Sequence, residues 1–357
     1  MYYACYNIFI MKNNKHITLQ KIASVAGCSV AVASRALSSD VLQNRTVAPD
    51  TAAHIVAVAR QLGWTPRNTY KKKRALGVVG ALLPGCESPL MQDLLDGLNA
   101  VAQQNNTPVY HYSRTTSESF RQFWDDHAAG SHQVGAVSYY PAERSEVPAF
   151  MEMFEKFRKR EAPLVIVHNN APEDFPAVSV RIDNIYGGRL AGKHLVDLNC
   201  SNNFLLGFGY TPYRYDRLKG CSEVLNENRI PYTCVSCKPN VPNDFELVKQ
   251  LEHLINGNFA EPVGVFVDGM YLALMVHNYF QSQGVEIGRK LKLIAYDDSL
   301  WMQCAYPAIT AVRQPFYEMG ALAMKKLFNM MRGFPEKSEY IKPDLIVRQS
   351  TIPASGV

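Results

Sequence analysis

Short apolar runs recur from residue 75 to residue 314 and alternate with amphipathic stretches, and this alternation restricts the possible folds more than any other feature of the 357-residue chain. The runs, each bounded by turn residues, are ALGVVGALL, TPVYHYS, VGAVSYY, APLVIVHN and AVSVRID, followed by NFLLGFG, YTCVSC, PVGVFVD, LKLIAYD and AITAVRQ. Helical patterns such as PLMQDLLDGLNAVAQQ separate them. Strands that alternate with helices predict parallel sheets. Two such series predict two similar lobes with a ligand cleft between them, since ligands of open parallel sheets bind beyond the carboxyl ends of the strands.

The charge of the chain is unevenly distributed. Residues 12–74 hold eleven Lys and Arg against two acidic residues, a net charge of +9, whereas residues 75–357 hold 26 basic and 30 acidic residues, a net charge of −4. A small basic segment attached to a mildly acidic body indicates a module that binds a polyanion. The alternative is an ordinary solvated, charged surface.

Several classes of protein do not fit the composition. No stretch approaches the roughly 20 apolar residues of a membrane-spanning helix. The apolar residues 1–11 lack a basic leading region and a cleavage site, so we expect no signal peptide; residues 1–16 are predicted to be a disordered extension, or synthesis begins at Met11. Most of the eight cysteines stand singly in apolar runs, which favours a reducing, cytoplasmic location. Cys234 and Cys237 form one CxxC without a second pair at zinc-site spacing, which leaves metal or redox chemistry as a weak alternative.

Residues 18–37 have the spacing of a helix-turn-helix. After Thr18, a plausible helix cap, small and apolar residues recur at intervals of three and four up to Ala26. Gly27 permits a tight turn, and Ser29 can cap a second helix that ends at Leu37. The predicted inward face of this second helix is Val32, Ala33, Ala36 and Leu37.

The second helix of such a pair lies in the major groove of DNA, with its first residues against base edges. Here Val30 and Ala31 would contact the bases, with room for a thymine methyl group, and Ser34 and Arg35 would follow one turn later. Arginine can bind guanine O6 and N7 or hold a phosphate. The alternative is two ordinary core helices with Arg35 in solvent.

A third helix is predicted from Pro49 to Leu62, before Gly63. Its predicted apolar face is Ala52, Ile55, Val56, Ala59 and Leu62. The polar and basic stretch TPRNTYKKKR, residues 65–74, then joins this three-helix bundle to the body.

The stretch from Ile17 to Arg67, ITLQKIASVAGCSVAVASRALS followed by VAPDTAAHIVAVARQLGWTPR, resembles the headpiece of the LacI/GalR family of bacterial transcription regulators. The resemblance implies that Val30, Ala31 and Arg35 contact operator DNA, and the predicted DNA-binding set also includes Thr18, Ser29 and Ser34. The loop before Val47 is longer than usual, and Lys73 stands near the place of a leucine that usually wedges into the minor groove. A lysine cannot act as an apolar wedge, so the hypothesis is that Lys71, Lys72 and Lys73 hold phosphates instead.

The resemblance covers nearly all of the chain. VSVRIDNIYGGRLAGKHLVDL, DRLKGCSEVL and LKLIAYDDSLWMQCAYPAITAVRQPFYEMGALAMKKL are similar to the segments that form the second lobe and the connections of this family. They imply a periplasmic-binding-protein-like (type I) α/β core of two lobes, which binds a small effector, a sugar or sugar derivative, and forms a homodimer. By the same resemblance, the effector-binding residues are Tyr139 or Tyr140, His168, Arg217, Asp268, Asp297 and Trp301. Val267 replaces the usual asparagine before the aspartate, which removes one ligand contact. A helix cap at Asp297, core packing of Trp301 and a buried, satisfied His168 remain alternatives.

The predicted fold class is therefore an all-α helix-turn-helix headpiece and a two-lobed α/β core with parallel sheets. The predicted boundaries are 17–66 for the headpiece, 67–75 for the hinge and 76–357 for the core, with lobe 1 at 76–179 and 305–335 and lobe 2 at 180–304 and 336–352. No catalytic, cofactor or metal-binding residues are expected, because Gly207 and Gly209 lack the third glycine of a dinucleotide loop and neither GxxxxGK[ST] nor HExxH occurs. The predicted partners are a pseudo-palindromic DNA operator, a carbohydrate effector and a second copy of the chain, without a membrane. A location on the cytoplasmic nucleoid is expected. A sugar-binding protein without DNA function and an enzyme are the alternatives.

Overall fold

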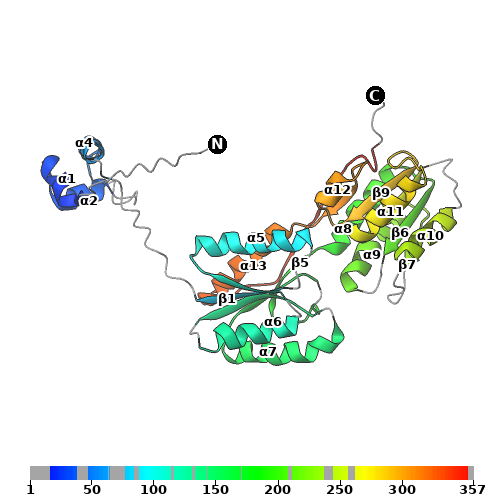
Figure 1. The fold of residues 1–357 in the computed structure, drawn as a ribbon, viewed down its shortest axis with the longest axis horizontal. Coiled ribbons are helices and arrows are strands. Elements are labelled where there is room, and N and C mark those ends of the chain that lie inside the picture. The colour runs from blue at the N-terminus through cyan, green and yellow to red at the C-terminus, as the bar shows by residue number, and fades with distance from the viewer. Residues whose placement is uncertain are drawn as a thin grey trace, which may run out of the picture. The chain divides into compact units, whose positions relative to one another are not determined.

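The computed structural model describes residues 17–37, 47–62, 64, 77–83, 88–113, 116–130, 133–141, 143–169, 171–207, 211–236, 244–255 and 262–352. The chain divides into two compact units, Met1–Lys73 and Arg74–Val357, each with its own core (Figure 1). No helix within the described residues is both long enough and apolar enough to cross a membrane.

The first unit is a bundle of three helices, α1 (Leu19–Val25), α2 (Val30–Ala36) and α4 (Pro49–Gln61). The hydroxyl groups of Thr18 and Ser29 accept hydrogen bonds from the first turns of α1 and α2, at 3.3 Å in both cases, as expected of helix caps. Gly27 has a φ of +65° in the turn between them, a conformation that favours glycine. The predicted helix-turn-helix is therefore confirmed.

The core of this bundle is made of small and β-branched side chains. Ile22, Ala23, Ala33, Ala36, Val47, Ile55, Val58 and Ala59 are buried. Five of the residues predicted to face inward are only half-buried: Val32, Leu37, Ala52, Val56 and Leu62. All but Val56 pack against the core, and Val58 takes the place expected for Val56. Alanines at the crossing of α1 and α2 let the two short helices approach closely.

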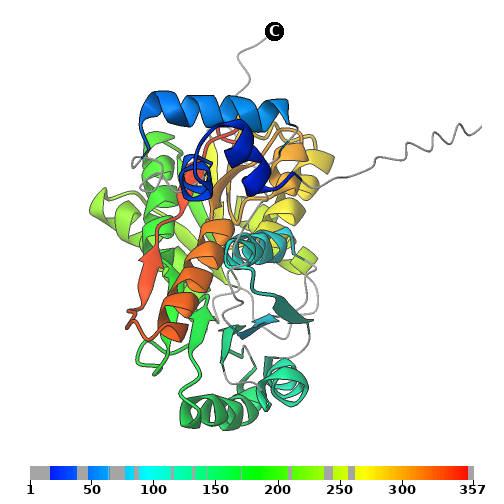
Figure 2. The ribbon, with the colours of Figure 1, turned by 90° about the vertical axis from the view of Figure 1, so that its left-hand side faces the viewer.

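The second unit contains two parallel sheets, as the alternation of strands and helices predicts. The first sheet has the order β11-β5-β4-β3-β1-β2. Its strands are β1 (Val78–Leu83), β2 (Val109–Ser113), β3 (Val134–Tyr139), β4 (Leu164–Val167), β5 (Val178–Ile182) and β11 (Glu339–Ile341). All its pairings are parallel. Figure 2 shows β11, in red, at the edge beside the green strands of this sheet.

Helices cover both faces of the first sheet (Figure 1). On one face lie α5 (Pro89–Gln104) and α13 (Phe316–Met331), and on the other lie α6 (Thr116–Phe123), the π-helical turn η1 (Trp124–Ala128) and α7 (Val147–Lys159), which follows the short 3-10 turn η2 (Arg144–Glu146). The backbones of α5 and α13 come close because Gly97 and Gly320 each face the other helix without a side chain. The apolar side chains of these helices form a separate hydrophobic core on each face of the sheet.

The second sheet has the order β12-β10-β9-β8-β6-β7, and only β12 runs antiparallel to its neighbour. Its strands are β6 (Asn202–Gly207), β7 (Thr233–Ser236), β8 (Val263–Val267), β9 (Leu291–Tyr296), β10 (Thr310–Arg313) and β12 (Asp344–Ile346). One face is covered by α8 (Asn184–Asp197) and α9 (Pro212–Glu227), and the other by α10 (Asp244–Ile255), α11 (Met270–Ser282) and α12 (Leu300–Cys304).

The chain crosses between the lobes later than the predicted lobe boundaries. Strand β10 belongs to the second sheet, where Thr310 pairs with Ile294, so placing residues 305–313 in lobe 1 was wrong. Residues 180–182 and 339–341 likewise pair within the first sheet. The sequence analysis placed this crossing at 305, before β10. Because β10 pairs in register with β9, it belongs to the second lobe, and the chain crosses to the first lobe after Arg313.

A buried ion pair holds the carboxyl-terminal segment to the second lobe. Arg348 binds both carboxylate oxygens of Asp298 at 2.8 Å, and the two side chains are only 15% and 6% exposed. Breaking a buried pair leaves an unpaired buried charge. Asp298→Ala is therefore expected to lower the free energy of unfolding by about 3–5 kcal/mol in urea denaturation. Asp344→Ala is the control: its pair with Arg313 is exposed, and its loss is expected to cost less than about 1 kcal/mol. Equal effects of the two substitutions would contradict the prediction.

Candidate functional site

The first unit presents one face of α2 to solvent. Ser29, Val30, Ala31, Ser34 and Arg35 are all exposed, and Val30 keeps 44% of its surface accessible although it is apolar. The guanidinium Nε of Arg35 donates a hydrogen bond to the carbonyl oxygen of Ala31 at 3.2 Å. Small side chains and one long cation therefore lie together on the surface of the helix.

Other residues of the predicted DNA-binding set lie outside this face. Thr18 is exposed at the start of α1, where its hydroxyl group caps the helix. Lys71, Lys72 and Lys73 lie outside the described residues. Val25, at the end of α1, is 50% exposed, and the predicted DNA-binding set does not include it. Its position off the inward face of Ile22 and Ala23 was the available signal.

In the second unit, the carboxyl ends of strands from both lobes meet in one buried cluster. Tyr139 ends β3 and His168 follows β4, while Asp268 follows β8 and Asp297 follows β9. His168 and Asp297 directly follow corresponding strands of the two lobes, and both have left-handed backbones, with φ values of +73° and +74°. Such conformations are costly for residues other than glycine and often occur at functional sites.

Arg217, on α9, joins the parts of this cluster that belong to the second lobe. Its Nε donates to Asn184 Oδ1 at 2.9 Å, and its Nη1 donates to the carbonyl oxygen of Asp268 at 2.7 Å and to Asp297 Oδ2 at 3.4 Å. The guanidinium group lies 3.8 Å from the ring centroid of Tyr296 and the residue is only 1% exposed. Arg217 is therefore held by protein groups on several sides.

Aromatic rings connect the two lobes. The rings of Tyr139 and His168 stack at 5.2 Å with 18° between their planes. The ring of Tyr213, on α9 of the second lobe, meets His168 edge-on at 4.8 Å. Burial, with smaller contributions from Tyr213 and Asp297, raises the pKa of Tyr139 well above its usual value, so the hydroxyl group keeps its proton.

Two residues of the predicted effector set lie elsewhere. The ring of Tyr140 packs edge-on against Phe150 and Phe175, in the core between the first sheet and α7, because successive side chains of an extended chain point to opposite faces. Trp301 is 47% exposed on α12, at the surface and outside the buried cluster.

The cluster also contains residues that the sequence analysis missed. Arg214 Nη1 binds Asp268 Oδ1 at 3.0 Å, and the side-chain amide of Gln314 donates to Asp297 Oδ1. Tyr213 and Arg214 precede Arg217 by four and three residues on α9, and this helical spacing, which places them on one face, was a usable signal. Gln314 directly follows β10, so its place at a strand end was a second signal.

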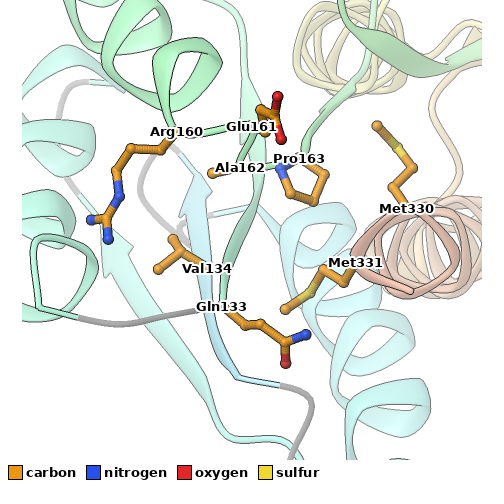
Figure 3. Close-up of a pocket in the computed structure, with 8 residues that line it drawn as sticks. All are labelled: Gln133, Val134, Arg160, Glu161, Ala162, Pro163, Met330 and Met331. Carbon is orange, nitrogen blue, oxygen red and sulfur yellow. The ribbon is translucent and has the colours of Figure 1, made fainter. Parts of the chain in front are cut away.

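A separate open pocket of about 110 Å³ lies at the opposite, amino-terminal edge of the first sheet (Figure 3). Gln133 and Pro163 directly precede β3 and β4, and Met330 and Met331 come from the end of α13. The pocket contains none of the predicted site residues. Among the described residues, no group of three or more His, Cys, Asp or Glu side chains could hold a metal ion; Cys237 lies outside them.

Comparisons with known proteins extend over both units. Residues 193–351 match the model of the periplasmic binding protein-like domain. The chain is 23% identical over 351 residues to the HTH-type transcriptional regulator DegA of Bacillus subtilis (strain 168), which covers 94% of this chain and 98% of DegA. The structure of the CelR–cellobiose complex, a transcriptional regulator, has a TM-score of 0.62 at 19% identity and covers 94% of this chain and 100% of that chain. The lac repressor dimer bound to operator and the anti-inducer ONPF has a TM-score of 0.60 at 19% identity, with 95% and 100% covered.

Proposed function

Because the chain belongs to the LacI/GalR family of bacterial transcription regulators, we propose that it is a sequence-specific DNA-binding repressor that responds to a sugar or sugar derivative. The observation that carries this proposal is the exposed face of α2, where small side chains allow close approach to base edges and Arg35 is the one cation of the helix. The excess of basic residues in the first unit supports the same conclusion.

The proposed DNA-binding residues are those of the head and the hinge: Thr18, Ser29, Val30, Ala31, Ser34, Arg35, Lys71, Lys72 and Lys73. Two heads of a homodimer would occupy the two half-sites of a pseudo-palindromic operator. The operator-bound lac repressor dimer is the precedent among the similar structures. Selection from a random duplex library with the full-length protein tests the proposal, and enrichment of one pseudo-palindrome is the expected result.

The proposed effector site is the buried cluster at the strand ends, with Tyr139, His168, Arg217, Asp268 and Asp297. The bound cellobiose in the similar CelR structure supports a sugar as the effector. Since Tyr139 and His168 belong to one lobe and Tyr213 to the other, an effector between them would change the relative positions of the lobes. A ligand shifts this equilibrium only by its different affinities for the two arrangements.

We also propose that the chain acts without catalysis and in the cytoplasm, on the nucleoid. Its relatives are transcription regulators, and the paired acids Asp297 and Asp298 bind protein cations: Arg217 and Arg348. Groups that are already paired in this way are poor candidates for a general acid or base.

Replacing Lys71, Lys72 and Lys73 together by alanine is expected to weaken DNA binding and to reduce its salt dependence. Each phosphate contact contributes about 0.9 to the slope of log K against log salt, so loss of three contacts in each of the two heads of the homodimer lowers the slope by about 5.4. Fluorescence anisotropy with the selected duplex over a range of salt concentrations measures this slope. An unchanged slope would contradict a role of these lysines at the DNA backbone.

A further inference from the structure

The chain enters the core at the amino-terminal edge of the first sheet. The N–H group of Val78, the first residue of β1, donates to the carbonyl oxygen of Gln133 at 3.0 Å. Gly77 has a φ of +128° and lies so close to Gln133 that a side chain would have no room. The entry point is therefore fixed beside Gln133, which also lines the open pocket (Figure 3).

Cations lie on both sides of this entry point. Arg160 follows α7 and lines the pocket, and its Nη1 donates to two carbonyl oxygens at the end of η1, at 2.5 and 3.1 Å. Lys159 is the last residue of α7. Arg332 directly follows α13, whose last residues form the other side of the pocket (Figure 3), and its Nη2 donates to Asn105 Oδ1 at 2.7 Å. These cations therefore come from helices on opposite faces of the sheet.

The charges of two of these cations are not compensated by an ion pair. Lys159 and Arg332 are exposed, and within the described part of the chain neither forms an ion pair, whereas Arg158 binds Glu155 at 2.7 Å. Glu161 is the acidic residue of the pocket. The edge around β1 and β3 is thus positively charged, although acidic residues outnumber basic ones over residues 75–357.

The proposed function brings this edge close to DNA, and the inference rests on that function. Gly77 follows Lys73, one of the proposed phosphate-binding lysines, by four residues, and four residues span at most about 14 Å. Duplex DNA carries one negative charge per about 1.7 Å of its axis, so further phosphates surround the one that Lys73 holds. The long side chains of exposed cations on the edge can reach them.

We propose that Lys159 and Arg332 form a second DNA-binding surface, on the core, and bind phosphates next to those held by the hinge lysines. The partner is the DNA backbone, because a phosphate contact needs only a cation at the surface, whereas reading a base needs an element inserted into a groove. Such contacts add affinity and salt dependence without sequence preference. Arg160 also holds the end of η1, so the test leaves it in place.

Replacing Lys159 and Arg332 together by glutamine tests the proposal in the full-length protein. Fluorescence anisotropy with the selected duplex measures the slope of log K against log salt. Each phosphate contact contributes about 0.9, so loss of two contacts in each protomer of the homodimer is expected to lower the slope by about 3.6. The preference for the selected duplex over a scrambled one is expected to stay the same. An unchanged slope would overturn the proposal.

Two matched variants separate a DNA contact from a general effect of charge. Arg229 and Lys290 precede β7 and β9 at the amino-terminal edge of the second sheet, and both are exposed and without an ion pair among the described residues. Replacing them together by glutamine removes the same charge and is expected to leave the slope unchanged. Lys159→Arg combined with Arg332→Lys keeps both charges and is expected to keep the wild-type slope. An equal loss of slope in the Arg229 and Lys290 variant would show that net charge alone acts, against the proposal.

The outcomes also separate this inference from the proposed function. If the wild-type chain selects a duplex and its salt slope does not depend on Lys159 and Arg332, the DNA-binding surface of the core is refuted alone. If the wild-type chain selects no duplex, the proposed regulator is refuted, and this inference falls with it.

Discussion

Replacing Arg35 by alanine is expected to weaken binding of the homodimer to the selected operator by about 30-fold or more, because one good bidentate contact to guanine is worth about 1–3 kcal/mol and each of the two heads loses one. The side chain lies exposed on α2 and contributes to no buried contact of the bundle, so the head should fold as before. Anisotropy titrations with the operator and with a scrambled duplex at one salt concentration measure the effect. Affinity for the scrambled duplex is expected to change far less.

Two controls make this result specific. Arg289→Ala removes a cation from the second unit, where its side chain is 72% exposed, and is expected to leave the operator affinity unchanged. Arg35→Lys keeps the charge but loses the planar guanidinium group with its two parallel donors. If Arg35 reads a base, the operator affinity of Arg35→Lys is therefore expected to be little higher than that of Arg35→Ala. If Arg35→Ala lowered the affinity for both duplexes equally and reduced the salt dependence, Arg35 would be a phosphate contact instead.

The second large effect is expected from Arg217→Met in the core. Methionine leaves Asp297 without its cation, and it leaves Asn184 Oδ1 and the carbonyl oxygen of Asp268 without this donor. Removal of one member of a buried pair costs about 3–5 kcal/mol. The free energy of unfolding of the core is expected to fall by this amount, and stabilisation by any sugar should be lost.

Urea denaturation of the full-length protein, followed by circular dichroism, measures the change. Arg189→Met is the matched control, because Arg189 on α8 pairs with Glu223 and Glu227 at the surface, and such exposed pairs contribute at most about 1 kcal/mol. An Arg217→Met protein as stable as the wild type would show that the buried network does not hold the cluster together.

The sequence was most informative where a local pattern determines a local structure. The caps at Thr18 and Ser29, the turn at Gly27 and the start of α4 at Pro49 follow from short-range chemistry, and the structure confirms them. The ten apolar runs all contain strands of the two sheets, because buried parallel strands require nearly continuous apolar side chains. Strands β11 and β12 were missed, since each has three residues and neither is fully buried.

The composition of the buried cluster was harder to predict. The end of β3 offers two consecutive tyrosines, and only the direction of each side chain separates Tyr139 in the cluster from Tyr140 in the core behind it. Gln314 reaches the cluster because the chain crosses between the lobes only after β10. The expected boundary at 305 had placed β10 in the first lobe. Trp301 fits a sugar-stacking role by residue type, but α12 places it at the surface. Contacts between segments distant in sequence decide which of these residues meet, although the alternation of side chains at the end of β3 and the position of Gln314 after β10 were local signals.

The most direct test of the whole account is the ratio of two dissociation constants, measured with the full-length protein at one salt concentration: one for the selected duplex and one for the same duplex in scrambled order. A sequence-specific regulator is expected to prefer the selected duplex by about 10³-fold or more. A ratio close to one would mean that the basic head binds DNA only through its charge, and it would contradict the assignment of α2 as the helix that reads the operator.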